Sequence, residues 1–241
     1  MKTLMCQISP LLLLLAASII LALSVAGSPA WAAGTEKTRV LLLGASVGQS
    51  WEISGIPRRL NDGRFEFEAV QAWQFDKTET LEEILMRPKR KFKPTKTYLK
   101  GFFGPSPKPA DIIVIKECAA YFPGDLANYK ELVKQWVSRI KAAGKKPALA
   151  TVVPVTRKHA LGKPGKIESI REFNNWIREY AAAENLPLVD LEAALREGDN
   201  GRFLKDKYTS GDGLHLNRQA YDLLDRLLLD NISKIAGAKR L

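Results

Sequence analysis

The sequence predicts an α/β protein in which a mostly parallel sheet lies between two layers of helices, and three observations support this. Short, continuous apolar runs recur along the chain, as expected for strands buried on both faces of a parallel sheet. Segments with helical periodicity lie between these runs, which is the pattern of a doubly wound sheet. The 241 residues suffice for one domain with a substantial core and are too few for two large domains.

Five segments are expected to be strands. Residues 65–70 alternate apolar and acidic side chains, which is typical of a more exposed strand near an edge. Ligands bind beyond the carboxyl ends of the strands in such sheets, so the residues that directly follow each strand are the candidate functional residues. The four other strands are continuous apolar runs at residues 38–43, 112–115, 148–153 and 186–189.

Helical periodicity appears between the strands and after the last one. A short helix is also expected to start around Val47, directly after the first strand. The longer helices are predicted at residues 81–86, 126–143, 167–184, 191–195 and 218–235.

Residues 87–109 break this alternation because they are rich in proline, lysine and arginine and also carry four aromatic residues. A segment of this length and composition predicts an excursion over the strand ends rather than a second domain. One interpretation is a solvated loop between a helix and the third strand. The other is a basic, aromatic-bearing flap that recruits an anionic or glycan substrate.

Residues 1–32 have the pattern of a removable signal peptide. Lys2 gives a positive start, residues 11–25 form an apolar run, and Ala32 ends a small-x-small cleavage site, so cleavage is expected after Ala32. The alternative is that the segment stays uncleaved as a membrane anchor, because it is long enough to approach a bilayer span. The remaining domain, residues 33–241, is expected to be periplasmic or secreted and to have no stable transmembrane segment.

Composition limits the chemistry of the mature chain. Removal of residues 1–32, whose only charged side chain is Lys2, lowers the formal net charge from +11 to +10. In an exported protein this excess suggests anionic envelope polymers or lipid headgroups rather than nucleic acid. One cysteine, Cys118, and two histidines, His159 and His215, cannot supply a cysteine-rich zinc site, an iron–sulfur cluster or an internal disulfide. We therefore expect no metal or organic cofactor.

A serine, Ser46, directly follows the first predicted strand. Gly44 and Gly48 flank it, and they allow the backbone to turn sharply and to bring its amides near a bound group. Ser46 could act as a nucleophile, or it could be a plain N-cap of the following helix.

A second group of polar residues precedes the last predicted helix. Asp212 lies three residues before His215 on a glycine-containing loop. An aspartate at this spacing can hold one ring nitrogen of the histidine and leave the other free to take a proton from a serine hydroxyl. The alternative, in which His215 only packs or caps, leaves Asp212 unexplained.

These motifs resemble the SGNH (GDSL-type) hydrolase family over essentially the whole mature chain. Gly44-Ala45-Ser46 resembles the family's G-D-S motif after the first strand, and Asp212-Gly213-Leu214-His215 resembles its D-x-x-H motif before the last helix. The resemblance implies a three-layer α/β/α sandwich of flavodoxin-like architecture. It also implies a hydrolase in which Ser46 attacks, His215 acts as the base and Asp212 holds the histidine.

The sequence departs from the family pattern around the oxyanion hole. Ala45 replaces the family's aspartate, and neither the usual glycine after the second strand nor the usual asparagine after the third is present. The substitutes that we consider are the backbone amides of Ser46 and Val47, the side chain of Gln71, and the positive charge of Lys116. Glu117 is equally able to pair with Lys116, so these two residues either line the site or form a structural ion pair.

Cys118 and His159 are expected to have no chemical role. Nothing near Cys118 in the sequence would lower its pKa, so a buried apolar role is expected. His159 lies among basic loop residues and is expected at the surface. Four aromatic residues could form sugar-stacking walls or pack in the core: Trp51, Trp73, Phe75 and Tyr121.

Two functions follow from these observations. The first is an exported serine esterase that hydrolyses an ester, such as an O-acetyl group on an envelope or extracellular glycan, through Ser46, His215 and Asp212. The alternative is a non-catalytic envelope protein that keeps the fold to bind an anionic polymer or glycan. The missing oxyanion-hole residues favour the alternative, and the complete triad favours the enzyme.

Overall fold

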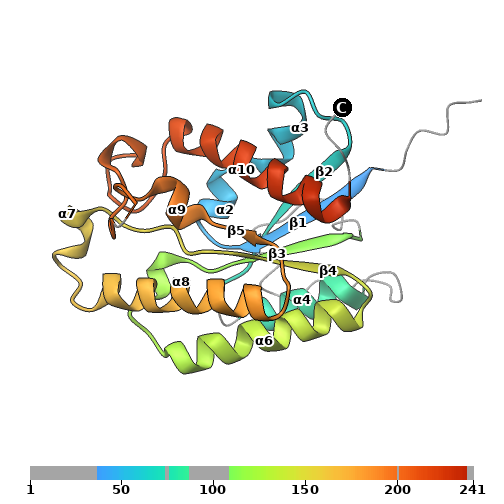
Figure 1. Ribbon diagram of the computed structural model, residues 1–241, viewed down its shortest axis with the longest axis horizontal. Helices are drawn as coiled ribbons and strands as arrows, with labels where there is room; N and C mark the ends of the chain where they lie inside the picture. Colours follow the sequence, from blue (N-terminus) through green and yellow to red (C-terminus); the bar gives the residue numbers. More distant parts are fainter. Residues whose placement is uncertain (1–36, 74–75, 87–108, 200, 238–241) are drawn as a thin grey trace, which may run out of the picture. The chain divides into compact units, whose positions relative to one another are not determined.

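The structure, a computed structural model, describes residues 37–73, 76–86, 109–199 and 201–237, and these residues form three layers with a sheet in the middle (Figure 1). The predicted signal peptide and residues 87–108 of the predicted loop or flap lie outside the described residues.

The central sheet has five strands in the order β2-β1-β3-β4-β5, and every neighbouring pair is parallel. The predicted α/β fold is thus confirmed, with all the described strands parallel and β2 at an edge. The strands are β1 (Thr38–Gly44), β2 (Phe65–Gln71), β3 (Ile112–Lys116), β4 (Lys146–Ala150) and β5 (Leu188–Val189).

The strand β4 ends at Ala150, three residues before the end that the apolar run predicted. The side chain of Asn174 is the reason, because its Oδ1 accepts from Val152 N at 2.7 Å and its Nδ2 donates to Val152 O at 2.9 Å. The backbone beyond Ala150 therefore pairs with a helix side chain, and the apolar residues that follow are buried outside the ladder.

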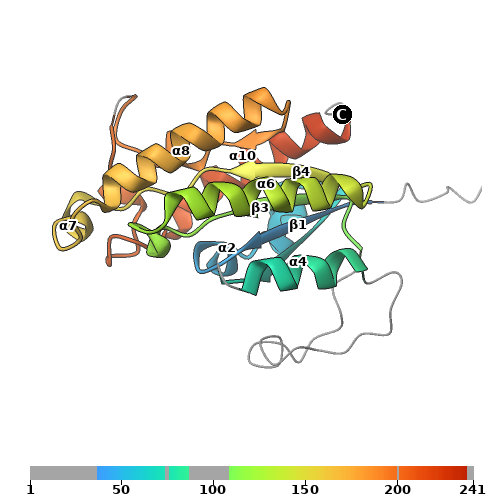
Figure 2. The same ribbon diagram turned by 90° about the horizontal axis from the view of Figure 1, so that it is seen from below.

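Helices cover both faces of the sheet (Figures 1 and 2). Helices α4, α6 and α8 supply the core on one face, and α2, α3, α9 and α10 supply it on the other. The α-helices are α2 (Val47–Ser50), α3 (Ile56–Arg59), α4 (Lys77–Met86), α6 (Leu126–Ala142), α7 (Arg157–Ala160), α8 (Lys166–Ala183), α9 (Leu191–Leu195) and α10 (Arg218–Ala236).

Strand β1 shows why continuous apolar runs occur in the central strands. Leu41 and Leu43 belong to the core on the α4, α6 and α8 face, whereas Val40 and Leu42 belong to the core on the opposite face. Because successive side chains of a strand point to opposite faces, a strand covered on both sides needs apolar residues at every position.

The long helices follow the predicted ranges closely, and side-chain caps mark where α6, α9 and α10 begin, whereas α8 begins without a side-chain cap. Asp125, Asp190 and Asn217 accept hydrogen bonds from backbone amides at the starts of α6, α9 and α10, as expected for these N-cap residues. Helix α4 is the exception, because it begins at Lys77 and not at the predicted Leu81. Lys77 is fully buried, and periodicity cannot identify a buried lysine as part of an apolar face.

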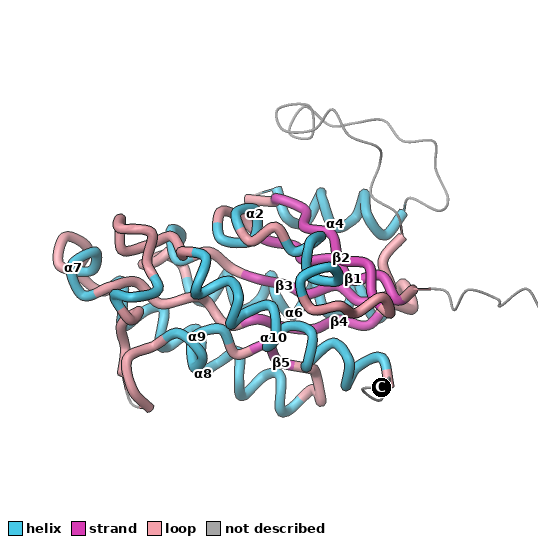
Figure 3. Tube along the Cα trace, turned by 90° about the horizontal axis from the view of Figure 1, so that it is seen from above, coloured by secondary structure: helices cyan, strands magenta, loops and turns pink. Residues whose placement is uncertain are grey.

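Short 3₁₀ turns complete the loops at the carboxyl ends of the strands. The turn η1 (Ile53–Gly55) follows α2, η4 (Ala119–Tyr121) follows β3, and η5 (Asp206–Tyr208) lies ahead of α10. Figure 3 shows this edge of the sheet from above, with the loops gathered beyond the strand ends. The sequence predicted none of these turns, because each contains too few residues to show a periodicity.

Candidate active site

The backbone turns sharply at Ser46, immediately after β1. Ser46 has φ 45° and ψ −87°, a conformation that costs a non-glycine residue about 1–3 kcal/mol. Its side chain makes no capping hydrogen bond to α2. Instead, Ser46 Oγ lies 3.2 Å from Cys118 Sγ, and either atom can donate.

Gly44 allows this turn to pack against the end of β3. A Cβ atom at position 44 would lie 3.2 Å from the carbonyl oxygen of Lys116 and 3.4 Å from its Cβ. A larger residue would therefore push apart the two strands that carry Ser46 and Cys118.

Asp212 holds both the ring and the backbone of His215. Asp212 Oδ2 lies 2.5 Å from His215 Nδ1, and Asp212 Oδ1 accepts from the amides of Leu214 and His215 at 2.9 and 2.8 Å. Burial raises the pKa of Asp212, but these hydrogen bonds lower it by more, so its pKa lies well below the usual range. An ionised Asp212 fixes the tautomer with the proton on Nδ1, which leaves Nε2 free to accept a proton.

The loop with His215 and the turn with Ser46 both lie at the carboxyl ends of the strands. Tyr221, in the first turn of α10, donates to the carbonyl oxygen of Val47 at 3.4 Å, and Val47 is the neighbour of Ser46. Among the described residues no hydrogen bond joins Ser46 to His215; each is bonded to the partner named above. Catalytic hydrogen bonds are often long or absent before substrate binds, so this geometry is compatible with a triad.

The structure corrects the expectation that His159 has only a surface role. Its Nδ1 lies 3.1 Å from the carbonyl oxygen of Asp212, and Lys163 Nζ lies 3.2 Å from its Nε2. Because a lysine ammonium can only donate, Nε2 accepts and Nδ1 donates to Asp212. The short helix α7 thus supports the back of the Asp212 loop, a contact that the sequence did not signal.

Gly213 makes the close approach between this loop and α7 possible. It has φ 75°, and a Cβ atom there would clash with Thr156 Oγ1 and lie 2.9 Å from His159 Cβ. The Gly213 carbonyl also accepts from the Thr156 amide at 2.9 Å. Glycine is therefore required within the D-x-x-H motif for steric reasons.

The residues after β3 are buried beneath the site. Lys116, Glu117 and Cys118 are 1%, 4% and 2% exposed. Of the two alternatives for these residues, the ion pair between Lys116 and Glu117 does not form, because Lys116 Nζ donates to the Glu117 carbonyl oxygen at 3.0 Å and the Glu117 carboxylate pairs with Lys77. The sequence did not indicate Lys77, which lies 40 residues before Glu117.

Gln71 and Val47, the other residues proposed for the oxyanion hole, differ in their exposure. Gln71 is exposed at the end of β2, whereas the side chain of Val47 is buried in the core. Ala72, the next residue after Gln71, donates from its amide to Gly44 O at 3.0 Å. The end of β2 is thus bonded to the residue two positions before Ser46.

The four aromatic candidates separate into core and rim. Trp51 is buried and donates to Asp225 at 2.8 Å, so it packs in the core. Trp73 is 47% exposed and contacts Tyr121 edge to face, with ring centroids 6.4 Å apart. Phe75 lies outside the described residues. An aromatic pair therefore joins the ends of β2 and β3, the two strands that flank β1.

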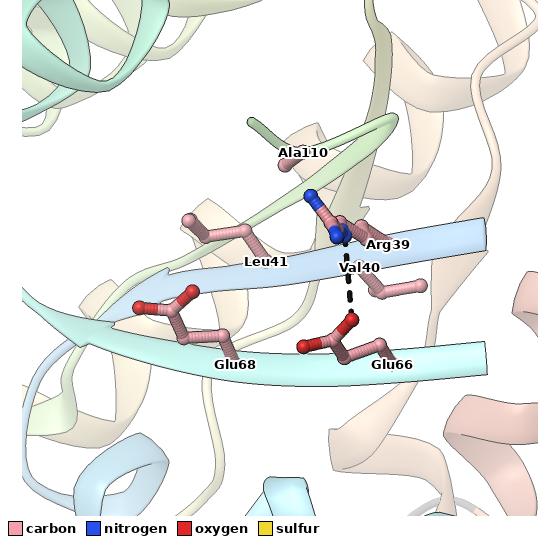
Figure 4. A pocket seen from close by; sticks show the side chains of 6 residues that line it. All are labelled: Arg39, Val40, Leu41, Glu66, Glu68 and Ala110. Carbon is pink, nitrogen blue, oxygen red and sulfur yellow. Dashed lines mark hydrogen bonds and ion pairs between the residues drawn. The ribbon is translucent and has the colours of Figure 1, made fainter. Parts of the chain in front are cut away.

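A shallow pocket lies away from the candidate active-site residues (Figure 4). Arg39 and Glu66, which are 3.3 Å apart, lie at the amino ends of β1 and β2, opposite the end with Ser46. The pocket is lined by Arg39, Val40, Leu41, Glu66, Glu68 and Ala110.

Searches of the described ranges for metal sites and membrane spans gave two negative findings. These ranges contain no group of three or more His, Cys, Asp or Glu side chains that could hold a metal ion. They also contain no helix that is long and apolar enough to cross a bilayer.

Comparison with known proteins decides the family. Residues 94–223, more than half of the chain, match the model of the GDSL-like Lipase/Acylhydrolase family. The protein belongs to this family. It is therefore a member of a hydrolase family that acts on ester bonds, and the resemblance seen in the sequence is confirmed. No curated protein matches the chain significantly.

Solved structures share the fold of this family member. A GDSL-like lipase from Bacteroides thetaiotaomicron aligns with a TM-score of 0.60 and 18% identity over 91% of this chain and 97% of its own. A lipase/acylhydrolase from Enterococcus faecalis gives 0.60 and 19% over 82% and 96%. The acetyl xylan esterase AlAXEase gives 0.55 and 16% over 82% and 98%. At these identities the likeness shows the fold alone.

The buried Lys116 predicts a specific dependence of stability on pH. Burial lowers the pKa of Lys116 in the folded protein below 10.5, its ordinary value in the unfolded chain. Between the lowered pKa and 10.5 the unfolded chain binds more protons than the folded protein, so stability rises with pH. Wild type and Lys116→Met are compared by urea unfolding from pH 7 to 10. As the pH rises, the free energy of unfolding of wild type should increase relative to that of the variant by up to about 1.4 kcal/mol per pH unit. Parallel pH profiles would show that Lys116 is not desolvated.

Proposed function

We propose that this GDSL-family protein is an exported serine esterase in which Ser46, His215 and Asp212 form a catalytic triad. The observation that carries the proposal is the hydrogen bond from the His215 ring to ionised Asp212 at 2.5 Å, on a loop at the carboxyl ends of the strands, where Ser46 follows β1. A serine in a strained turn after a strand and an oriented imidazole are the two parts that acyl transfer requires.

The reaction proceeds in two acyl-transfer steps. Ser46 Oγ attacks the ester carbonyl while His215 Nε2 takes its proton, and the tetrahedral intermediate collapses as that proton passes to the departing alcohol. Water then attacks the acyl-serine with His215 again acting as the base. Asp212 stabilises the imidazolium in both steps. Before the first step, Ser46 Oγ must turn from Cys118 towards His215.

The oxyanion hole depends on the backbone in this proposal. The amides of Ser46 and Val47, in the turn after β1, are the donors to the attacked carbonyl oxygen that this proposal requires. Each missing donor costs about 3–4 kcal/mol of transition-state stabilisation. We therefore expect slow turnover relative to an esterase that has the full set of donors.

The proposed substrate is an O-acetyl ester of a glycan. The exposed indole of Trp73 beside Tyr121 offers a flat apolar surface of the kind that packs against a sugar ring. The fold shared with an acetyl xylan esterase adds support. The predicted basic segment at residues 87–109 would attract an anionic envelope polymer as a further partner.

The alternative function is binding of an anionic polymer or glycan without catalysis. One observation favours it: Ser46 Oγ is bonded to Cys118 and not to His215. The hydrogen bonds that orient His215 favour the enzyme, because a protein that only binds has no need of a fixed imidazole tautomer.

The first experiment tests the triad. The protein is treated with a serine-directed aryl phosphonate, and the labelled residue is identified by mass spectrometry. Label on Ser46, and loss of aryl acetate hydrolysis by at least about 10³-fold in Ser46→Ala and His215→Ala, are expected. Absence of label on Ser46, with equal rates for wild type and Ser46→Ala, would favour the binding protein.

The second experiment tests the substrate. Trp73→Ala should raise KM for an acetylated oligosaccharide by up to about 10-fold, since a stacking contact contributes about 0.5–1.5 kcal/mol, and should change KM for a small alkyl acetate little. Trp176→Ala is the matched control, because Trp176 stacks on Tyr180 on α8 with centroids 5.1 Å apart. Equal KM values for wild type and Trp73→Ala on the oligosaccharide would exclude the sugar contact.

The third experiment tests export. The supporting observation is the signal pattern of residues 1–32, and the expected mature protein begins at Ala33. Mass spectrometry of the full-length gene product, purified from the periplasm or medium of a bacterial host, should find this terminus. An intact terminus on protein that stays in the cytosol would contradict export, and an intact terminus in the membrane fraction would indicate an uncleaved anchor.

A further inference from the structure

Three lysines from three different elements are buried next to one backbone segment. Lys77 begins α4, Lys116 ends β3 and Lys166 begins α8, and their side chains are 0%, 1% and 2% exposed. A buried ammonium group is unfavourable unless hydrogen bonds compensate for the lost water. The acceptors of these three groups therefore show what the lysines do.

Each lysine donates to main-chain carbonyl groups of residues 116–122, the segment that begins at the last residue of β3. Neutral backbone acceptors predominate, because the Glu117 carboxylate accepts from Lys77 alone among the three. The bonds run from Lys77 to Lys116 O at 3.1 Å, from Lys116 to Glu117 O at 3.0 Å, from Lys166 to Phe122 O at 2.6 Å, and from Lys166 to Ala119 O.

The same segment contacts the proposed nucleophile. Cys118 lies in the middle of it, and its Sγ is 3.2 Å from Ser46 Oγ. The side chain of Lys116 packs along Gly44, two residues before Ser46, so that a Cβ atom at position 44 would lie 3.8 Å from Lys116 Cδ. The lysines therefore act on Ser46 through this segment.

We propose that Lys77, Lys116 and Lys166 are positioning residues for ester hydrolysis, which fix the backbone of residues 116–122 and thereby the wall of the site beside Ser46. The proposal rests on the proposed function. The asparagine that the family resemblance led us to expect after the third strand is missing, and buried side-chain donors hold this segment instead. A displacement of about 1 Å at a reacting centre can cost about 10²-fold in rate, so rigidity here affects the chemical step.

The test separates positioning from stability. Lys116→Met and Lys166→Met are made, and the reaction of Ser46 with an aryl phosphonate is resolved into reversible affinity and first-order inactivation rate. The inactivation rate should fall about 10²-fold while the reversible affinity changes little. Inactivation rates equal to that of wild type in both folded variants would overturn the positioning role.

Asn174→Leu is the matched control. Asn174 is also fully buried and also clamps backbone atoms, but those of Val152 at the end of β4. This variant should lose thermal stability to a similar extent and keep the inactivation rate of wild type. A loss of inactivation rate in Asn174→Leu equal to that in the lysine variants would show that the effect is general destabilisation.

Hydrogen exchange gives a readout that does not need activity. Amides of residues 116–122 should exchange at least about 10-fold faster in the two lysine variants and unchanged in Asn174→Leu, because their surroundings open locally. Unchanged exchange in the lysine variants would overturn the proposal whatever their activity. If the wild type itself is not labelled at Ser46, the proposed function and the catalytic role of the lysines fall together. Equal labelling of all variants overturns only the lysine proposal.

Discussion

The strained turn at Ser46 is the constraint on which the rest of the site depends. A residue at φ 45° persists only where its surroundings leave no alternative, and here they act from both sides. The buried β1 approaches β3 so closely that a Cβ atom at position 44 would lie only 3.2 Å from the Lys116 carbonyl oxygen and would require β3 to shift. On the other side, Trp51 is held by the buried Asp225 of α10, which also binds Arg59 at 2.6 Å. Packing around the carboxyl end of β1 thus holds Ser46 in its strained conformation.

Charge is distributed differently in the two halves of the candidate site. Asp212 and His215 are about half exposed and lie on a loop that turns at two glycines with positive φ, so water and substrate can reach the imidazole. The segment beneath Ser46 is buried, and its charged groups bond to the backbone or, in the case of Glu117, pair with Lys77. Charges that need to exchange protons remain accessible, whereas charges that only hold the backbone are buried, where their hydrogen bonds are strongest.

The local parts of the fold could be predicted from the sequence, and the long-range contacts could not. Continuous apolar runs identify parallel strands because both faces are covered, and the spacing of Asp212 and His215 identifies their contact because both lie in one loop. The bonds from Lys166 to Ala119 and from Lys77 to Glu117 span 47 and 40 residues. A lysine in an exposed position and a lysine in the core look alike in a sequence. The bonds from Asn174 to Val152, beyond the end of β4, are long-range contacts of the same kind.

Cys118 shows how one side chain can both preserve and delay a reaction. The sequence alone indicated a buried apolar role, and the residue is buried, but its Sγ also bonds to Ser46 Oγ. A hydroxyl bonded to a thiol, whichever of the two donates, is bound more weakly than one bonded to an imidazole, since thiols are weak hydrogen-bond partners. The Ser46 hydroxyl can therefore leave Cys118 and bond to His215 at little cost in free energy once a substrate has excluded water. In the proposed mechanism this contact holds Ser46 before it turns to His215, so an intact Asp212–His215 pair is compatible with a serine that is bonded to Cys118.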